Sequence, residues 1–301
     1  MKHGRLRLSN VGTLKIRGKA RTRGEPKTCE IQHKDGRWYA SITVDCRPQR
    51  TGGALAAGMD WGVETFATLA LSDGTREHLE NLRHTRHALV KLRHAQQAVS
   101  RKRKRSKNRE KARRVVAHLH QKTANQRRDF LHQTSARLVA RIGLLMTEQL
   151  SIRAMTAHGG AQKRGLNREI LSTAPALFLQ MLTYKAEEAG GWYLEADTRQ
   201  LKPSQTCHRC GRQVKKSLAE RWHTCPCGAS CPRDENSALV LLHEALSRQE
   251  LAACGDTIGV VSVKHDTPPL AQARVESFIP VTQMSTGLET FEPGRLSMRQ
   301  R

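Results

Sequence analysis

Two pairs of cysteines in the last third of the chain have the spacing of metal ligands. Cys207 and Cys210 lie in the segment CHRCG, and Cys225 and Cys227 follow in CPCG. Two close thiolate pairs, each on a turn, suit the tetrahedral geometry of a structural zinc ribbon. One residue rather than the usual two separates Cys225 from Cys227, so the nearby Cys231 is an alternative ligand.

The compartment in which the chain works decides how these thiols are interpreted. No apolar stretch approaches the roughly 20 residues that a membrane span needs. The N-terminal segment MKHGRLRLSN also lacks the apolar centre of a signal peptide. We therefore expect a cytoplasmic protein without a membrane partner, in which crowded thiols bind metal rather than form disulfides. His208 and His223 are further alternative ligands.

Three acidic residues lie where predicted elements of secondary structure begin or end. Asp60, in MDWG, is at a strand bend; Glu148 ends the apolar run IGLLMTEQL; Asp234 opens the helix-like run DENSALVLLHEAL. A helix with an exposed Glu148 is the alternative to a strand at the second acid. If the three carboxylates converge, they could hold two Mg²⁺ ions roughly 4 Å apart, as in a two-metal nuclease.

The charge of the chain indicates a polyanionic partner. Lys and Arg number 52 against 27 Asp and Glu, which gives a formal net charge of +25. So large an excess would repel itself unless a polyanion were usually present, and nucleic acid is the first candidate.

The basic residues concentrate in RKRKRSKNREKARR, residues 101–114, where Glu110 is the one acid. A solvated helical hairpin would leave this charge uncompensated, so we favour contacts to backbone phosphates, which hold nucleic acid without reading its sequence. The predicted phosphate-binding residues are Arg101, Lys102, Arg103, Lys104, Arg105, Lys107, Arg109, Lys111, Arg113 and Arg114.

Hydrophobic patterning predicts a mixed α/β protein. Residues 5–50 alternate apolar and polar side chains around Asp35-Gly36, which predicts a small β module with a hairpin. Two strands around a glycine turn follow in MDWGVETFATLALSDG, and a helical hairpin is predicted over about 82–141. Strands and helices alternate in this way along the chain, which indicates a mixed sheet covered by helices.

The segment between the second acid and the cysteines predicts one helix followed by the strand WYLEA. The apolar residues expected to face inward are Leu171, Leu177, Met181 and Tyr184, and Gly190-Gly191 is expected to end the helix. A last helix begins near Asp234, with Ala238, Leu239, Leu242 and Leu246 facing inward. Residues 251–301 show turn residues without a sustained period, so we expect a largely disordered tail.

Several of these stretches together resemble the transposon-encoded TnpB proteins, which are relatives of the type V CRISPR effectors. The matching segments occur in the family's order: GMDWGVETFATLALSDG, RRDFLHQTSARLVARIGLLMTEQL, KRGLNREIL, LTYKAEEAGGWYLEAD, PSQTCHRCG and CPRDENSALVLL. Three departures are Pro232, where an acid is common, the short second cysteine spacing, and Gln149 in place of the Asp of the family's Glu-Asp-Leu.

The resemblance implies a RuvC-like nuclease of RNase H fold whose acids match Asp60, Glu148 and Asp234. It implies a partial wedge-like β-barrel module at 1–50, a nuclease core at 51–204 and a final core helix at 231–250. A zinc ribbon is implied at 205–230, held by the four cysteines named first. Relatives carry further N-terminal sequence, so we expect a shortened member.

The function that the resemblance implies is that of an RNA-guided DNA endonuclease, using Mg²⁺ and zinc, with a guide RNA and target DNA as partners at the nucleoid. The alternative is a decayed relative that binds zinc and RNA without cutting. A transposase that itself joins DNA strands is disfavoured, because nothing in the sequence resembles the HUH-and-tyrosine pattern of such enzymes.

Overall fold

The computed structural model describes residues 3–9, 11–17, 24–34, 37–46, 50–157, 160–217, 219–253 and 279–281. The chain divides into two compact units, one of Met1–Pro48 with Lys264–Arg301 and the other of Gln49–Val263. No helix in the described part of the chain is long and apolar enough to span a bilayer.

The first unit contains a five-stranded antiparallel sheet. Its strands, in the order β1-β2-β12-β4-β3, are β1 (His3–Leu8), β2 (Gly12–Arg17), β12 (Ile279–Val281), β4 (Arg37–Asp45) and β3 (Glu25–Lys34). The β3–β4 pairing runs up to Lys34 opposite Arg37, which confirms the predicted hairpin; its Asp35-Gly36 turn lies outside the described residues. Ile16, Cys29 and Ala40 form the buried core of this sheet.

The expected disordered tail falls almost entirely outside the described residues. Two short parts of 251–301 are described: the end of the last helix, which runs to Ala253, and β12. Strand β12 pairs with β2 through Val281 and Ile16, and with β4 over Ile279–Val281. These three residues therefore form part of a sheet, which differs from the expectation for the tail.

The second unit is built on a mixed five-stranded sheet in the order β7-β6-β5-β8-β9. Its strands are β5 (Leu55–Trp61), β6 (Thr65–Leu71), β7 (Arg76–Glu80), β8 (Ile142–Glu148) and β9 (Trp192–Ala196). β5, β6 and β7 are antiparallel neighbours, whereas β8 runs parallel to β5 and β9 parallel to β8. The predicted mixed α/β class is confirmed, and the helical alternative for the run ending at Glu148 is wrong.

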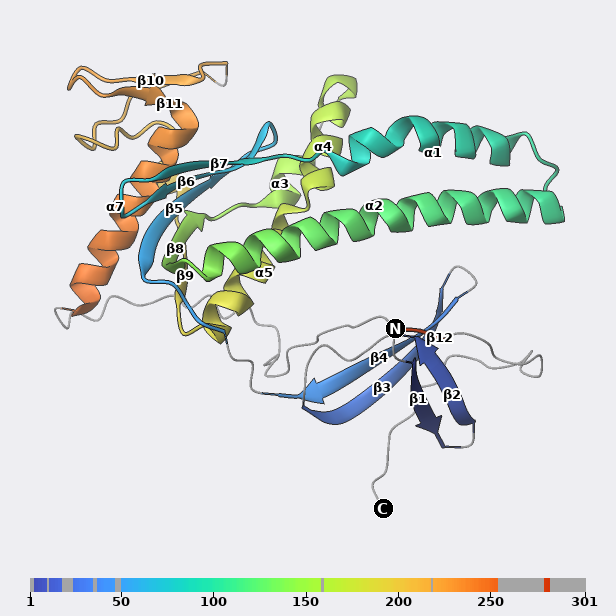
Figure 1. Cartoon of the computed structure of the whole chain (residues 1–301). Coiled ribbons are helices and arrows are strands. Elements are labelled where there is room, and N and C mark those ends of the chain that lie inside the picture. Colours follow the sequence, from blue (N-terminus) through green and yellow to red (C-terminus); the bar gives the residue numbers. More distant parts are fainter. Residues whose placement is uncertain are drawn as a thin grey trace. The chain divides into compact units, whose positions relative to one another are not determined.

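Helices cover both faces of this sheet (Figure 1). They are α1 (His84–Ser100), α2 (Lys107–Val139), α3 (Ile152–Ala157), α4 (Ala161–Thr173), α5 (Pro175–Glu188), α6 (Thr198–Leu201) and α7 (Arg233–Ala253). One face packs on α2 and α5 through residues such as Phe66, Leu138 and Phe178. The opposite face packs on α7, through Ala56 and Met146 of the sheet and Leu241 of the helix. The predicted inward face of the last helix is confirmed.

The predicted single helix before β9 is wrong in one respect, because the structure divides it into α4 and α5. Ala174 joins them with φ 51°, and Pro175 begins α5. Proline cannot continue a helix from the preceding turn, and it disfavours helical backbone in the residue before it. The helical face therefore changes direction at this point, and Leu171, which we expected to face inward, is 55% exposed.

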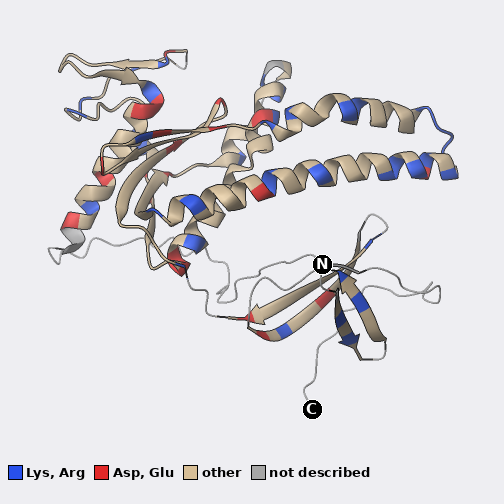
Figure 2. Ribbon diagram, in the orientation of Figure 1, with Lys and Arg blue, Asp and Glu red and all other residues tan. Residues whose placement is uncertain are grey.

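The helical hairpin of α1 and α2 is present as predicted and projects beyond the sheet (Figure 1). Ser106 caps α2, since its side chain accepts a hydrogen bond from the Arg109 amide at 3.1 Å. The basic run of residues 101–114 covers the connection between the helices and the first turns of α2. Figure 2 shows its Lys and Arg residues gathered at the free end of the hairpin.

Candidate active site and metal centre

Asp60 and Glu148 lie side by side at the ends of two neighbouring parallel strands. The β5–β8 pairing ends with Met59 opposite Thr147, so the two acids follow at matching positions. Side chains alternate along a strand, and Met146, two residues before Glu148, belongs to the core beneath α7. Both carboxylates therefore project from the face that α7 covers.

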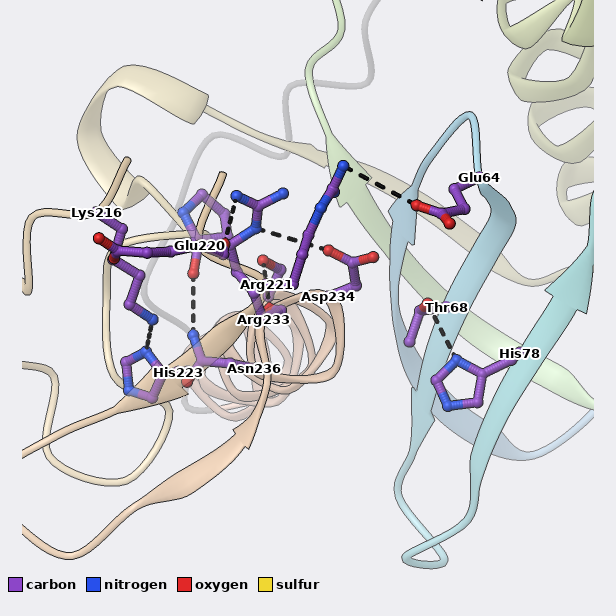
Figure 3. Close-up of polar contacts among 12 residues, drawn as sticks. Glu64, Thr68, His78, Lys216, Glu220, Arg221, His223, Arg233, Asp234 and Asn236 are labelled. Atoms are coloured by element: carbon purple, nitrogen blue, oxygen red, sulfur yellow. Dashed lines mark hydrogen bonds and ion pairs between the residues drawn. The ribbon is translucent and has the colours of Figure 1, made fainter. Parts of the chain in front are cut away.

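Asp234 lies in the first turn of α7, the helix that covers this face of the sheet, as the sequence predicted. The negative charge suits the amino end of a helix, where the first backbone N–H groups lack partners within the helix. Arg233, one residue earlier, has its Nε 3.7 Å from Oδ1 of Asp234 (Figure 3).

Asp60 lies within electrostatic range of the other two acids. Burial raises the pKa of Asp60 well above its ordinary value, and the charges of Glu148 and then Asp234 raise it further. Arg233 acts in the opposite direction on the same carboxyl group. Burial also raises the pKa of Glu148. Negative charge is therefore disfavoured here unless a cation compensates it, as at functional carboxylate sites.

This set of donors fits a hard divalent cation, because Mg²⁺ prefers carboxylate oxygens. The three carboxylates are spaced more widely than the donor atoms of a closed metal site. Among the residues that the structure describes, the only group of three or more Cys, His, Asp or Glu with all ligand atoms within 4.8 Å of one another is the four-cysteine cluster.

The four cysteines predicted from their spacing converge on one point. Sγ of Cys207 lies 3.7 Å from that of Cys227, and Sγ of Cys210 lies 3.6 Å from that of Cys225. Four thiolates around one zinc at about 2.3 Å are about 3.8 Å apart, so the separations fit a tetrahedral zinc site. Cys231 lies outside the cluster.

Each cysteine pair is held by a turn that ends in glycine. Gly211 follows Cys210 with φ 71°, and Gly228 follows Cys227 with φ 87°. Their amides donate to the carbonyls of Cys207 and Cys225, each at 2.9 Å. A residue with a Cβ rarely adopts such a backbone, so the two glycines close the turns that bring the thiols together.

Asn236 of α7 attaches this cysteine-bearing segment to the helix that carries Asp234. Its Oδ1 accepts from the backbone amide of His208 at 3.1 Å and from His208 Nδ1 at 3.0 Å. Its Nδ2 donates to the carbonyls of Pro203 at 3.2 Å and Thr206 at 2.7 Å. All the hydrogen-bonding capacity of one fully buried side chain is used at this contact. His208, considered above as a ligand, thus contributes to the anchor instead.

Sequence reasoning did not find Asn236. A polar residue among the inward-facing positions of a helix was the available signal, because a buried amide needs partners. His223, the other histidine considered as a ligand, is fully buried in the hairpin of β10 (Trp222–Thr224) and β11 (Ser230–Pro232). There it lies opposite Cys231 and outside the four-cysteine cluster.

The predicted phosphate-binding residues share the free end of the hairpin, but one of them has an evident structural role. Nη1 of Arg109 donates to the carbonyl of Val99 at 3.3 Å and to that of Lys102 at 3.2 Å. These hydrogen bonds connect the first turn of α2 to the end of α1. Glu110 pairs with Arg114 one turn away on the exposed surface.

Comparison with known proteins identifies the family. Residues 29–158 match the family model described as "Probable transposase", and residues 176–241 match the model "Cas12f1-like, TNB domain". The chain is 36% identical over 243 residues to a "Putative RNA-guided DNA endonuclease" of Streptomyces pristinaespiralis, over 78% of this chain and 56% of that protein. It is 29% identical to the "Putative RNA-guided DNA endonuclease InsQ" of Escherichia coli K12, over 71% of this chain and 55% of that protein. The chain belongs to the TnpB family.

The TnpB-family chain spans little more than half the length of these two relatives. Among solved structures, a Cas12f1–sgRNA–target DNA complex aligns with a TM-score of 0.43 and 14% identity, over 71% of this chain and 55% of the other.

Proposed function

We propose that this TnpB-family chain is an RNA-guided DNA endonuclease encoded by a transposable element, which hydrolyses DNA phosphodiester bonds. The observation that carries the proposal is the placement of Asp60 and Glu148 at matching ends of the paired strands β5 and β8, with Asp234 in the first turn of the helix that packs on the same face. Clustered carboxylates are the donors that hold the metal ions of two-metal phosphoryl-transfer sites.

The roles of the acids follow from their positions. Asp60, the acid with two carboxylate neighbours, would contact both Mg²⁺ ions, and Glu148 and Asp234 would each complete one of the two sites. When bound, the two ions supply an activated water and stabilise the charge of the leaving oxygen. Asp60 is half-buried, so the residue remains in contact with solvent.

The sheet supports assigning the second unit to the RNase H-like, or RuvC, class. Three antiparallel strands are followed by two strands parallel to the central one. Asp60 and Glu148 lie on the neighbouring strands β5 and β8, and Asp234 lies on α7. We assign the first unit as part of a wedge-like β-barrel module, on the basis of its antiparallel sheet and the family. The four-cysteine segment is proposed to be a ribbon that holds structural Zn²⁺.

The partners are proposed to be a guide RNA and its target DNA, in the cytoplasm at the nucleoid. At the tip of the hairpin, the nine basic side chains other than Arg109 would contact backbone phosphates. Because such contacts displace condensed counterions, affinity for nucleic acid should fall steeply as the salt concentration rises.

The test combines RNA sequencing with a cleavage assay. The purified chain, with the RNA that copurifies, is mixed with Mg²⁺ and single-stranded DNA or a duplex with a pre-melted target matching that RNA. We expect cleavage that Asp60→Ala abolishes and that the matched control Asp129→Ala, an exposed aspartate of α2, retains. Zinc and RNA binding without cleavage of either substrate would instead support the binding-only alternative.

A further inference from the structure

One row of side chains crosses the sheet beside the acids. The β5–β6 register places Thr68 opposite Asp60, and the β6–β7 register places His78 opposite Thr68. Directly paired residues project from the same face of a sheet, so all three lie on the face that α7 covers. His78 is thus two strands away from the innermost acid, on the same side.

Two hydrogen bonds continue this row onto α7. His78 Nδ1 lies 3.3 Å from Oγ1 of Thr68, which is 2% exposed (Figure 3). His78 Nε2 lies 3.1 Å from Oε1 of Glu235, the residue that follows Asp234. A ring that accepts from the Thr68 hydroxyl at Nδ1 donates to Glu235 through Nε2.

The first turn of α7 is therefore held from two sides. Asn236 attaches it to the cysteine-bearing segment, and Glu235 attaches it to the edge of the sheet through His78. Asp234 precedes both of these attached residues. A helix turn fixed at two neighbouring positions has little freedom to rotate, so the direction of the Asp234 Cα–Cβ bond is fixed as well.

We propose that His78 is a positioning residue that orients Asp234 toward Asp60 through Glu235, with Thr68 fixing the orientation of its ring. The proposal rests on the proposed nuclease function of these acids. It resembles the outer-shell hydrogen bonds that orient metal ligands in proteins and whose loss costs about 10- to 100-fold in metal affinity or activity.

A simple surface ion pair is the competing interpretation. The side chains of His78 and Glu235 are 49% and 23% exposed, and exposed pairs contribute little to stability. Removing His78 should therefore leave the fold intact under either interpretation. The two interpretations differ in what happens to the first turn of α7 and to metal binding.

The experiment compares His78→Ala, His78→Gln and Glu235→Gln in the full chain, with His243→Ala as the matched control. His243 is an exposed histidine of the same helix, beyond the acids. Hydrogen exchange at the amides of residues 233–237 measures the order of the turn. Titration with Mn²⁺ followed by electron paramagnetic resonance measures metal binding without any need for cleavage.

We expect His78→Ala to speed exchange at 233–237 and to weaken Mn²⁺ binding about tenfold. His78→Gln should restore much of the slow exchange and of the Mn²⁺ affinity, because its amide can still donate to Glu235. Glu235→Gln should give exchange rates and Mn²⁺ affinities between those of His78→Ala and His78→Gln. In the cleavage assay, kcat should fall while KM for DNA stays unchanged. His243→Ala should match the parent chain in every measurement.

Parent-like exchange and Mn²⁺ binding in both His78→Ala and Glu235→Gln would overturn the proposal. The same holds if both substitutions change only KM for DNA, because His78 would then contact nucleic acid rather than orient Asp234. If the parent chain cuts no DNA, the proposed function fails on that ground alone. The exchange and Mn²⁺ measurements then still decide the role of His78.

Discussion

Gly58 of β5 lies directly against the backbone of Ala238 in α7. A Cβ at Gly58 would stand 2.1 Å from the Ala238 carbonyl oxygen and 2.3 Å from the Leu242 amide nitrogen, which is closer than real contacts allow. Gly58 is two residues before Asp60 on the same face of the strand. The absence of one side chain thus sets how closely the helix carrying Asp234 approaches the strand carrying Asp60.

Gly58→Ala should push α7 away from the sheet. The obstructing atoms are backbone and cannot rotate aside, so we expect a loss of stability of about 1–3 kcal/mol, as for other overpacked cores. Cleavage should fall further than stability, because the acids separate. The control is Gly165→Ala in α4, where a Cβ meets nothing within 4 Å and alanine should stabilise the helix. Equal unfolding midpoints for the two variants in urea would contradict the account.

A second prediction concerns Asp60 in the metal-free chain. Burial and its two acidic neighbours raise the pKa of Asp60 in the folded state. The folded chain therefore binds this proton more tightly than the unfolded chain, and stability falls as pH rises from about 4 toward the folded-state pKa. Asp60→Asn removes the charge, so it should raise the melting temperature in EDTA at pH 7 while abolishing cleavage.

The measurement for Asp60 is thermal unfolding in EDTA between pH 4 and pH 8. The difference between Asp60→Asn and the parent chain should grow as pH rises and should shrink when Mg²⁺ is added, since a cation stabilises the carboxylates. Asp129→Asn, at an exposed site, is the control and should not show this pattern. If the difference in melting temperature does not change with pH, the ionised carboxylate of Asp60 does not destabilise the fold.

A third prediction tests the zinc ligands. Because the thiols of Cys207, Cys210, Cys225 and Cys227 converge and Cys231 does not, metal analysis should find about one zinc per chain. Cys227→Ser should lose the metal, whereas Cys231→Ser should keep it. Zinc lost from Cys231→Ser and kept in Cys227→Ser would assign the fourth ligand to Cys231 instead.

The fourth prediction concerns the anchor formed by Asn236. Asn236→Asp keeps the shape of the side chain but replaces its two N–H donors, leaving the carbonyls of Pro203 and Thr206 facing a carboxylate. We expect a loss of at least about 2 kcal/mol in stability and faster hydrogen exchange at residues 203–208. Zinc content should remain at one per chain, because no cysteine is touched. Parent-like exchange would show that other contacts hold this segment on α7.

The sequence predicted the parts of the site that depend on local pattern. The strand ending at Glu148, the helix beginning near Asp234 and the cysteine turns all follow from alternation, apolar spacing or glycine placement within short windows. The convergence of the three carboxylates was a hypothesis, and the effect of Glu148 and Asp234 on the pKa of Asp60 supports it.

The contacts that orient the site residues could not be predicted, because they depend on the register between segments that are distant in the sequence. His78 and Glu235 are 157 positions apart, and their contact requires β7 to pair with β6 in one register and α7 to lie on the same face. Gly58 did carry a signal, since glycine inside a strand often marks a close backbone approach. The inward position predicted for Leu171 failed because the periodicity was followed across the Ala174–Pro175 break.

The last prediction concerns Lys185, which is 2% exposed and joins α5 to α2. Its Nζ donates to the His132 carbonyl at 2.8 Å and to Ser135 Oγ at 2.6 Å. Burial, followed by the charge of Arg50, lowers the pKa of Lys185 from 10.5 to about 8, although Glu188 acts in the opposite direction. Between these two values the unfolded chain binds the proton more tightly, so stability should rise with pH.

The full effect of Lys185 is roughly 3 kcal/mol, since one pKa unit corresponds to about 1.4 kcal/mol. Lys185→Met keeps the length of the side chain and removes its charge. It should therefore be more stable than the parent at pH 7, and this difference in stability should become much smaller by pH 10. Denaturant unfolding at both values measures this, with the exposed Lys91→Met as control. A Lys185→Met chain that is less stable by the same amount at both pH values would show that the hydrogen bonds to His132 and Ser135 outweigh the cost of burying the charge.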